Sequence, residues 1–134
     1  MTIEKAMSSK VVSIAASDTL VHAVRVMKEN KIKHLPVVDA SGGLVGIVTD
    51  RDLKEASASD ATTLEVHELV YLLDKVKIDS IMTKNVVTIE KGTPLKQAAL
   101  LMVEKGIGCL PVADGKQLTG ILTRTDILRY FAGL

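Results

Sequence analysis

Residues 46–52 read Gly-Ile-Val-Thr-Asp-Arg-Asp, and residues 120–126 read Gly-Ile-Leu-Thr-Arg-Thr-Asp, 74 positions further along the chain. Each stretch holds a turn glycine, a short apolar run and Thr-x-x-Asp, and a helical pattern follows it. A strand that runs directly into a helix places backbone N–H groups and the positive end of a helix dipole at the junction. An acidic side chain beside the junction can accept hydrogen bonds from sugar hydroxyls. The repeated stretch therefore points first to a nucleotide.

The repeat is wider than this motif. Residues 7–39 match residues 82–114 at 13 of 33 positions with an offset of 75, and residues 44–53 match residues 118–127 at 5 of 10. Such self-similarity indicates two copies of one supersecondary unit, neither of which buries its apolar face alone. We therefore expect repeats at 1–57 (with part of the linker) and 77–134, separated by a linker at 58–76.

Each copy reads as strand, helix, strand, turn, strand and helix, an α+β unit. Strands are expected to begin at Val11 and Val86. Helices follow with apolar residues at i, i+3, i+4 and i+7, the first capped by Asp18 or Thr19 and the second with Pro94 in its first turn. The next strands carry Leu-Pro-Val, and their proline predicts an edge or strand-start position. Glycine-containing turns then predict a hairpin to the motif strand.

The linker and the N-terminal segment have their own patterns. Thr62 and Glu65 form a capping-box pattern before an apolar helical stripe, which predicts an extra helix over residues 64–76. Ile3 and Met7 have counterparts in Ile78 and Met82. The N-terminal segment is therefore expected to be equivalent to the segment that precedes the second copy.

Composition excludes several classes of protein. The chain has 134 residues with 47% hydrophobic and 25% charged side chains, which is typical of a folded domain with its own core. We expect no membrane span and no signal peptide. Seventeen basic against sixteen acidic residues and 2% aromatics argue against nucleic acid binding. A single cysteine, Cys109, fits a cytoplasmic location, and no cluster has metal-ligand spacing.

The doubled pattern of Leu-Pro-Val-x-Asp followed by Gly-x-x-Thr-x-x-Asp resembles a tandem CBS-domain pair, also called a Bateman module. The linker is also similar to that of acetoin-utilisation accessory proteins. The resemblance implies two βαββα repeats related by pseudo-two-fold symmetry, with clefts that bind AMP, ADP or ATP. It also implies a homodimer formed through helices, a regulatory role exerted on an effector protein of unknown identity, and no required cofactor.

The same resemblance assigns site residues. The motif aspartates Asp52 and Asp126 take the ribose hydroxyls, and phosphate is faced by Thr49, Arg51, Thr123 and Thr125. Ile47 and Ile121 supply apolar walls near the base. The other copy completes each cleft: the Asp52 cleft with Thr93, Ala98, Ile107 and Gly108, and the Asp126 cleft with Asp18, Ala23, Ile32 and Lys33.

The copies differ just before Leu-Pro, where the first has Lys33-His34 and the second Gly108-Cys109. Because charge-assisted hydrogen bonds strengthen phosphate contacts, the clefts are expected to be unequal, with Arg51, Lys33 and His34 handling most of the phosphate charge. Thr-x-x-Asp is also a helix N-capping arrangement, and a cap can keep the aspartate oriented toward a ligand.

Three alternatives remain open at this point. The chain is a ligand-free dimerisation scaffold, or it is a sensor of S-adenosylmethionine, whose cation gains nothing from Lys33 and Arg51. The third alternative, a nucleotide-hydrolysing enzyme, needs a metal cluster or base that the sequence does not display, so we expect no enzymatic activity.

Overall fold

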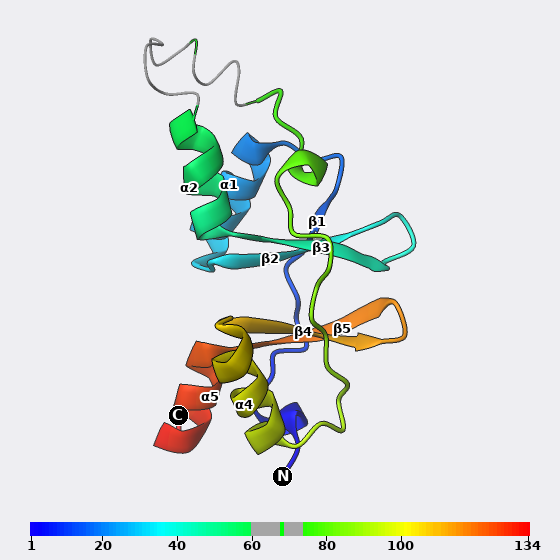
Figure 1. Ribbon diagram of the computed structural model, residues 1–134, viewed down its shortest axis with the longest axis vertical. Coiled ribbons are helices and arrows are strands. Elements are labelled where there is room, and N and C mark those ends of the chain that lie inside the picture. The colour runs from blue at the N-terminus through cyan, green and yellow to red at the C-terminus, as the bar shows by residue number, and fades with distance from the viewer. Residues whose placement is uncertain (60–67, 69–73) are drawn as a thin grey trace. The chain divides into compact units, whose positions relative to one another are not determined.

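The computed structural model describes residues 1–59, 68 and 74–134 (Figure 1). The described elements, in chain order, are η1 (Ile3–Lys5), β1 (Ile14–Ala15), α1 (Leu20–Asn30), β2 (His34–Val38), β3 (Leu44–Thr49), α2 (Asp50–Ser59), η2 (Ile78–Ser80), α4 (Leu95–Lys105), β4 (Cys109–Asp114), β5 (Gln117–Thr123) and α5 (Arg124–Ala132). Most of the predicted linker helix and its capping box lie outside the described residues; of its described residues, Glu68 is helical, whereas Asp74 and Lys75 form a turn.

The chain forms two compact units, each named here by its motif aspartate. The Asp52 unit consists of residues 12–41 and 45–86, and the Asp126 unit of residues 1–11, 42–44 and 87–134. The units therefore cut across the sequence repeats. The reason is local: Ile3 of η1 is fully buried in the core of the Asp126 unit, and Ile78 of η2 is fully buried in that of the Asp52 unit. The predicted equivalence of these two segments is confirmed.

The Asp52 unit holds a three-stranded sheet in the order β1-β2-β3, and α1 and α2 lie on the same face of it (Figure 1). β1 and β2 are parallel, with Ile14 opposite Val37 and Ala15 opposite Val38. Two expectations are wrong here. The first strand begins at Ile14 rather than Val11, and Pro36 lies in the central strand rather than at an edge. Pro36 is tolerated because the pairing with β1 involves the two residues that follow it.

The Asp126 unit is built on the predicted hairpin. β4 and β5 are antiparallel from Cys109 opposite Thr123 to Asp114 opposite Gln117, and Gly115 makes the turn at φ 62°. The strand expected from Val86 is reduced to one parallel bridge between Ile89 and Val112. Pro111 has no N–H to donate, and it takes part in this pairing only through its carbonyl, which accepts a hydrogen bond from the Ile89 N–H at 3.1 Å. The N–H that proline lacks would lie past the end of this short pairing.

Each helix buries three of the four apolar positions that the spacing predicts; at the i+4 position, Val24 is 43% exposed and Ala99 is half-buried. In α1 the buried residues are Leu20, Ala23 and Met27, and in α4 they are Leu95, Ala98 and Met102. Thr19 caps α1, since its Oγ1 accepts from the N–H of His22 at 3.1 Å. Asp18 instead accepts from the N–H of Ala15 at 2.8 Å. Pro94 is the N-cap of α4, one position before the first turn expected for it.

The segment that follows η2, with Met82 and Thr83, packs closely against Gly46 of β3, and this packing generates a stability prediction. A Cβ added to Gly46 would lie 2.5 Å from Met82 Sδ and 3.0 Å from the Thr83 carbonyl oxygen. Because the backbone atom cannot move aside freely, Gly46→Ala is expected to lower the free energy of unfolding by about 1–3 kcal/mol in urea titrations. Gly92→Ala is the control, because nothing lies within 4 Å of the added atom. Equal stabilities of the two variants would contradict this packing.

Candidate functional site

Each motif forms a sharp junction between a strand and a helix. In the Asp126 unit, Thr123 Oγ1 accepts from the N–H of Asp126 at 3.1 Å, and Asp126 Oδ2 accepts from the N–H of Thr123 at 2.8 Å. In the Asp52 unit, Thr49 and Asp52 make the same two bonds at 3.2 and 2.9 Å. The capping reading of Thr-x-x-Asp is therefore confirmed in both copies.

The cap leaves part of each carboxylate available. Asp52 and Asp126 are half-buried, and the capping bond uses Oδ2 alone. Among the described residues, no hydrogen bond reaches the Oδ1 atom of either aspartate. An ionised carboxylate has about four acceptor positions, so an oriented Oδ1 can accept bonds from a ligand's hydroxyl groups.

A short segment runs beside each motif strand. In the Asp52 unit, Ile47 and Thr83 exchange two backbone hydrogen bonds at 3.0 and 2.9 Å, and in the Asp126 unit Ile121 and Ser8 exchange two at 2.9 Å. The exposed residues Thr83 and Ser8 therefore lie next to the motif strands. Site reasoning from the sequence missed both, although the matched spacing of Ile3 and Ile78 was the signal that could have found them.

The cations of the two junctions come from different parts of the fold, Lys33 from the chain just before β2 and Arg124 from the first residue of α5. The N–H of Asp50 donates to the Lys33 carbonyl at 2.9 Å, and the equivalent N–H of Arg124 donates to the Gly108 carbonyl at 2.9 Å. A Cβ on Gly108 would lie 3.2 Å from an Arg124 guanidinium nitrogen, so the glycine makes room for that side chain. The Asp126 unit thus has a cation that the sequence comparison overlooked. Within the described part of the chain, neither Lys33 nor Arg124 takes part in an ion pair.

The other predicted phosphate residues are placed as follows. Arg51 is exposed and its Nε lies 3.1 Å from Glu55 Oε1, and Lys54 Nζ lies 3.0 Å from Asp50 Oδ2. Exposed pairs of this kind contribute little, so Arg51 can exchange its partner for a phosphate. Thr125 is exposed on the first turn of α5, and His34 is half-buried at the start of β2.

The residues assigned to the opposite copy's cleft lie as follows. Thr93, Ala98, Ile107 and Gly108 are in the Asp126 unit, and Asp18, Ala23, Ile32 and Lys33 are in the Asp52 unit. Ala23 and Ala98 are fully buried in the cores of their units, so neither side chain is exposed at a surface. Ile32 and Ile107 are half-buried. The assignment of these residues to the opposite copy's cleft stays a prediction.

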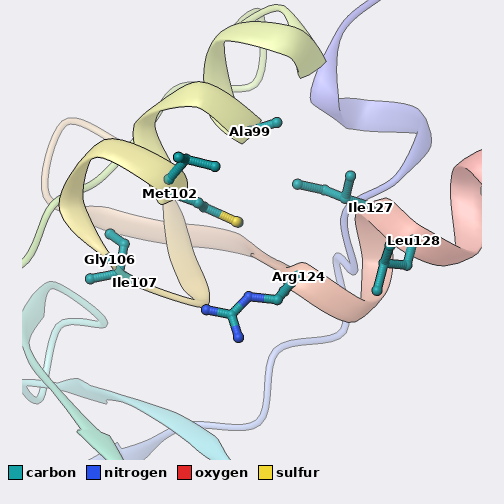
Figure 2. A pocket seen from close by; sticks show the side chains of 8 residues that line it. Ala99, Met102, Gly106, Ile107, Arg124, Ile127 and Leu128 are labelled. Atoms are coloured by element: carbon teal, nitrogen blue, oxygen red, sulfur yellow. The ribbon is translucent and has the colours of Figure 1, made fainter.

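Each unit also has a hollow of about 380 Å³ between its two helices. Figure 2 shows the one in the Asp126 unit, where Ile127 of α5 points toward Ala99 and Met102 of α4 and the Arg124 side chain extends at its edge; Leu128 also lines it. The equivalent hollow in the Asp52 unit is lined by Val24, Met27, Lys28, Lys31, Ile32, Lys33, Asp50 and Leu53. The first is walled mainly by apolar groups and the second carries three lysines.

Cys109 lies directly opposite Thr123 in the β4–β5 ladder. Burial, with a smaller contribution from the nearby Asp126 carboxylate, raises the pKa of its thiol from 9.0 to about 12. A thiol that stays protonated at neutral pH is a poor nucleophile. Cys109 is therefore a packing residue behind the Asp126 junction.

In the described ranges, 1–59, 68 and 74–134, no group of three or more His, Cys, Asp or Glu side chains is placed to hold a metal ion. The same ranges contain no helix that is long and apolar enough to cross a membrane.

Comparison with known proteins agrees with this geometry. The chain matches the CBS domain family twice, over residues 3–59 and 78–133. It belongs to the CBS domain family and has the fold of a tandem CBS pair. It is 40% identical over 127 residues to a CBS domain-containing protein of Dictyostelium discoideum, covering 94% of this chain and 88% of that one.

Solved structures resemble it over nearly the whole chain. The CBS pair of protein MJ0100, crystallised with 5′-methylthioadenosine and S-adenosyl-L-methionine, superposes with a TM-score of 0.83 at 30% identity, covering 98% of this chain and 99% of that one. CBSX2 of Arabidopsis thaliana in complex with AMP gives 0.82 at 28%, with 98% and 96% covered. An acetoin utilisation protein (AcuB) of Vibrio cholerae gives 0.85 at 29%, with 99% and 91% covered, in line with the similarity noted in the linker.

Curated relatives with enzyme names are matched over a small part of their length. The chain covers 21% to 24% of these proteins, among them L-aspartate semialdehyde sulfurtransferase and inosine-5′-monophosphate dehydrogenase of Methanocaldococcus jannaschii. The match is to a CBS portion, so it carries no catalytic activity over to this chain.

The raised pKa of Cys109 generates a prediction of pH dependence. The folded state holds the proton up to about pH 12, whereas the unfolded thiol releases it near pH 9.0. The stabilisation from the neutral thiol is therefore complete below pH 9 and is lost as pH rises, by at most about 1.4 kcal/mol per pH unit. In urea titrations from pH 8 to 10.5, wild type is expected to lose more stability than Cys109→Ser. Parallel pH profiles of the two proteins would contradict the buried thiol.

Proposed function

We propose that this CBS pair is a regulatory module that binds an adenosine nucleotide (AMP, ADP or ATP) at its motif junctions and acts through a partner protein. The observation that carries the proposal is the reciprocal threonine–aspartate cap, found in both units. It fixes each carboxylate with one oxygen bonded to the backbone and the other unbonded by the described residues. A carboxylate oriented in this way suits the two neighbouring hydroxyls of a ribose.

The charges near the caps support a phosphorylated ligand. Arg124 lies against the Gly108 backbone in one unit, and the Lys33 backbone is bonded to the motif in the other. A helix N-terminus adds a favourable field for anions at each junction. AMP bound to CBSX2, a relative in fold, supports the same class of ligand. Both units therefore have a cation for phosphate, held by α5 in one and by the chain just before β2 in the other.

S-adenosylmethionine or methylthioadenosine is the second candidate. The observation that favours it is the complex of the MJ0100 CBS pair with these two molecules, at 30% identity to this chain. Their adenosine suits the same aspartates, but they have no phosphate for Arg124 or Lys33. The ligand-free scaffold is the third reading, and it predicts no saturable binding at all.

The site prediction is tested by calorimetric titration of the purified protein with AMP, ADP, ATP, methylthioadenosine and S-adenosylmethionine. Asp52→Ala and Asp126→Ala are each expected to weaken binding at their own junction by about 10- to 100-fold, because each removes charge-assisted hydrogen bonds. Asp114→Ala, an exposed aspartate at the end of β4, is the control and should bind as wild type does.

Asp126→Asn separates binding from folding. Its amide oxygen can still accept from the Thr123 N–H, so the cap survives, while the charge that faces the ligand is lost. The variant should unfold at nearly the wild-type urea concentration and still bind poorly. Weak folding with full affinity would instead assign Asp126 to the cap alone, and absence of heat with all five ligands would establish the scaffold reading.

The role of Arg124 gives a prediction of ligand preference. Arg124→Ala is expected to reduce the affinity for ATP by about 10-fold or more and to leave the affinity for methylthioadenosine nearly unchanged, because a guanidinium acts on phosphate and not on adenosine. Arg129→Ala, on the same helix and exposed, is the matched control. An equal loss for both ligands would show that Arg124 supports the fold of the junction rather than the phosphate.

A further inference from the structure

The hollow between α1 and α2 of the Asp52 unit is named here the lysine hollow, after Lys28, Lys31 and Lys33, which line it. Of its other lining residues, all but Asp50 are apolar. Asp50 is paired with Lys54 at 3.0 Å, whereas no described residue forms an ion pair with the three lysines. The hollow therefore combines three uncompensated cations with an apolar wall, in a chain whose net charge is only +1.

The other repeat shows that the fold does not require these lysines. By the offset of 75, the positions equivalent to Lys28, Lys31 and Lys33 are Val103, Gly106 and Gly108. The hollow between α4 and α5 has the same volume of about 380 Å³ and no lysine in its lining. The three cations are therefore a property of this one site and not of the helix pair that forms it.

The backbone of Lys31 makes the same point more strongly. Lys31 follows the last turn of α1 in the left-handed conformation, at φ 54° and ψ 44°. Among the described residues it is the one residue other than glycine with a positive φ, and its counterpart Gly106 has φ 65°. Glycine suits this conformation because it has no Cβ. A lysine kept where the backbone favours glycine, at an apolar hollow, indicates a function for its ammonium group.

We propose that the lysine hollow binds an acidic amphipathic helix of the partner protein through which the module acts. Apolar side chains of that helix fill the hollow, and its carboxylates meet Lys28, Lys31 and Lys33. An apolar helix face laid into a groove is a recurrent mode of peptide recognition, and complementary charge selects the partner. This inference rests on the proposed function, because it assumes a partner and assigns the chemistry of the partner's contact.

A segment with several carboxylates fits the hollow better than a small anion does. The three lysines are exposed, and an exposed cation attracts a single anion weakly in water that contains salt. They also lie on different parts of the backbone: the last turn of α1, its C-cap, and the chain before β2. One occupant reaches all three only if it carries several charges. The apolar wall adds affinity only for an occupant that also has apolar side chains.

The test is calorimetric titration of the nucleotide-free protein with a synthetic helical peptide that carries leucines on one face and glutamates on both sides of them. The control probe is the same peptide with lysine in place of every glutamate. The acidic peptide should bind saturably, and its affinity should fall as salt is added because salt screens exposed charges. The basic peptide should not bind.

Two variants test the assigned lysines. Lys28→Gln and Lys31→Gly should each weaken binding of the acidic peptide by about 3- to 10-fold, because each removes one exposed charge contact. Since Lys31→Gly removes the Cβ from a left-handed residue, it should unfold at a urea concentration no lower than that of wild type, which separates lost binding from damaged folding. Lys105→Ala, at the end of α4, removes an exposed charge elsewhere and should bind the peptide as wild type does.

Equal binding of the two peptides, or unchanged affinity in both lysine variants, would overturn the proposal. Displacement of the acidic peptide by equimolar inorganic tripolyphosphate would also overturn it and would assign the hollow to a small anion. Titration of the same variants with AMP and ATP keeps the two proposals apart. A protein that binds nucleotide but not the acidic peptide refutes this inference alone, and one that binds only the peptide refutes the proposed nucleotide site alone.

Discussion

The reciprocal threonine–aspartate cap is the interaction on which the rest of each unit depends. It satisfies two backbone N–H groups at the point where a motif strand becomes α2 or α5, so it sets the direction in which that helix leaves the sheet. The same bonds orient the carboxylate. A structural role at Asp52 and Asp126 is therefore compatible with the proposed ligand role, because the bond that starts the helix uses only Oδ2.

The sequence predicted what depends on periodicity and on the internal repeat. The spacing of Leu20, Ala23 and Met27 gave the buried face of α1, the turn residues gave the β4–β5 hairpin, and the doubled motif gave the family. These features depend on local sequence, or they occur in both repeats, so a single sequence contains enough information to find them. The matched positions of Ile3 and Ile78 likewise predicted two equivalent segments, each of which proved to be a short 3-10 helix with a buried isoleucine.

The features that could not be predicted from the sequence depend on contacts between segments that are distant along the chain. The strand expected from Val11 is limited by how much of it reaches β2, and Pro36 is acceptable in a central strand because of where the β1 pairing begins. The position of Arg124 was not predicted because it depends on Gly108, a residue just before β4 whose missing side chain leaves room for the guanidinium. Comparison of motifs aligns positions along the chain, and it does not show which residues from different segments are in contact in the fold.

The two repeats share one backbone arrangement at the motif junction but carry their charged side chains at different positions. Asp50, the first residue of α2, is equivalent to Arg124, the first residue of α5. Lys33, just before β2, is equivalent to Gly108, just before β4. At this contact the cation is therefore on a flexible lysine in one unit and on a planar, bidentate guanidinium in the other, and the Asp52 junction also has Arg51 in its motif. Since the backbone bond between the two positions is the same length in both units, the difference is one of side-chain chemistry and not of fold. Exchange of charges at one contact therefore makes the two junctions chemically unequal while the backbone plan of the two repeats stays the same.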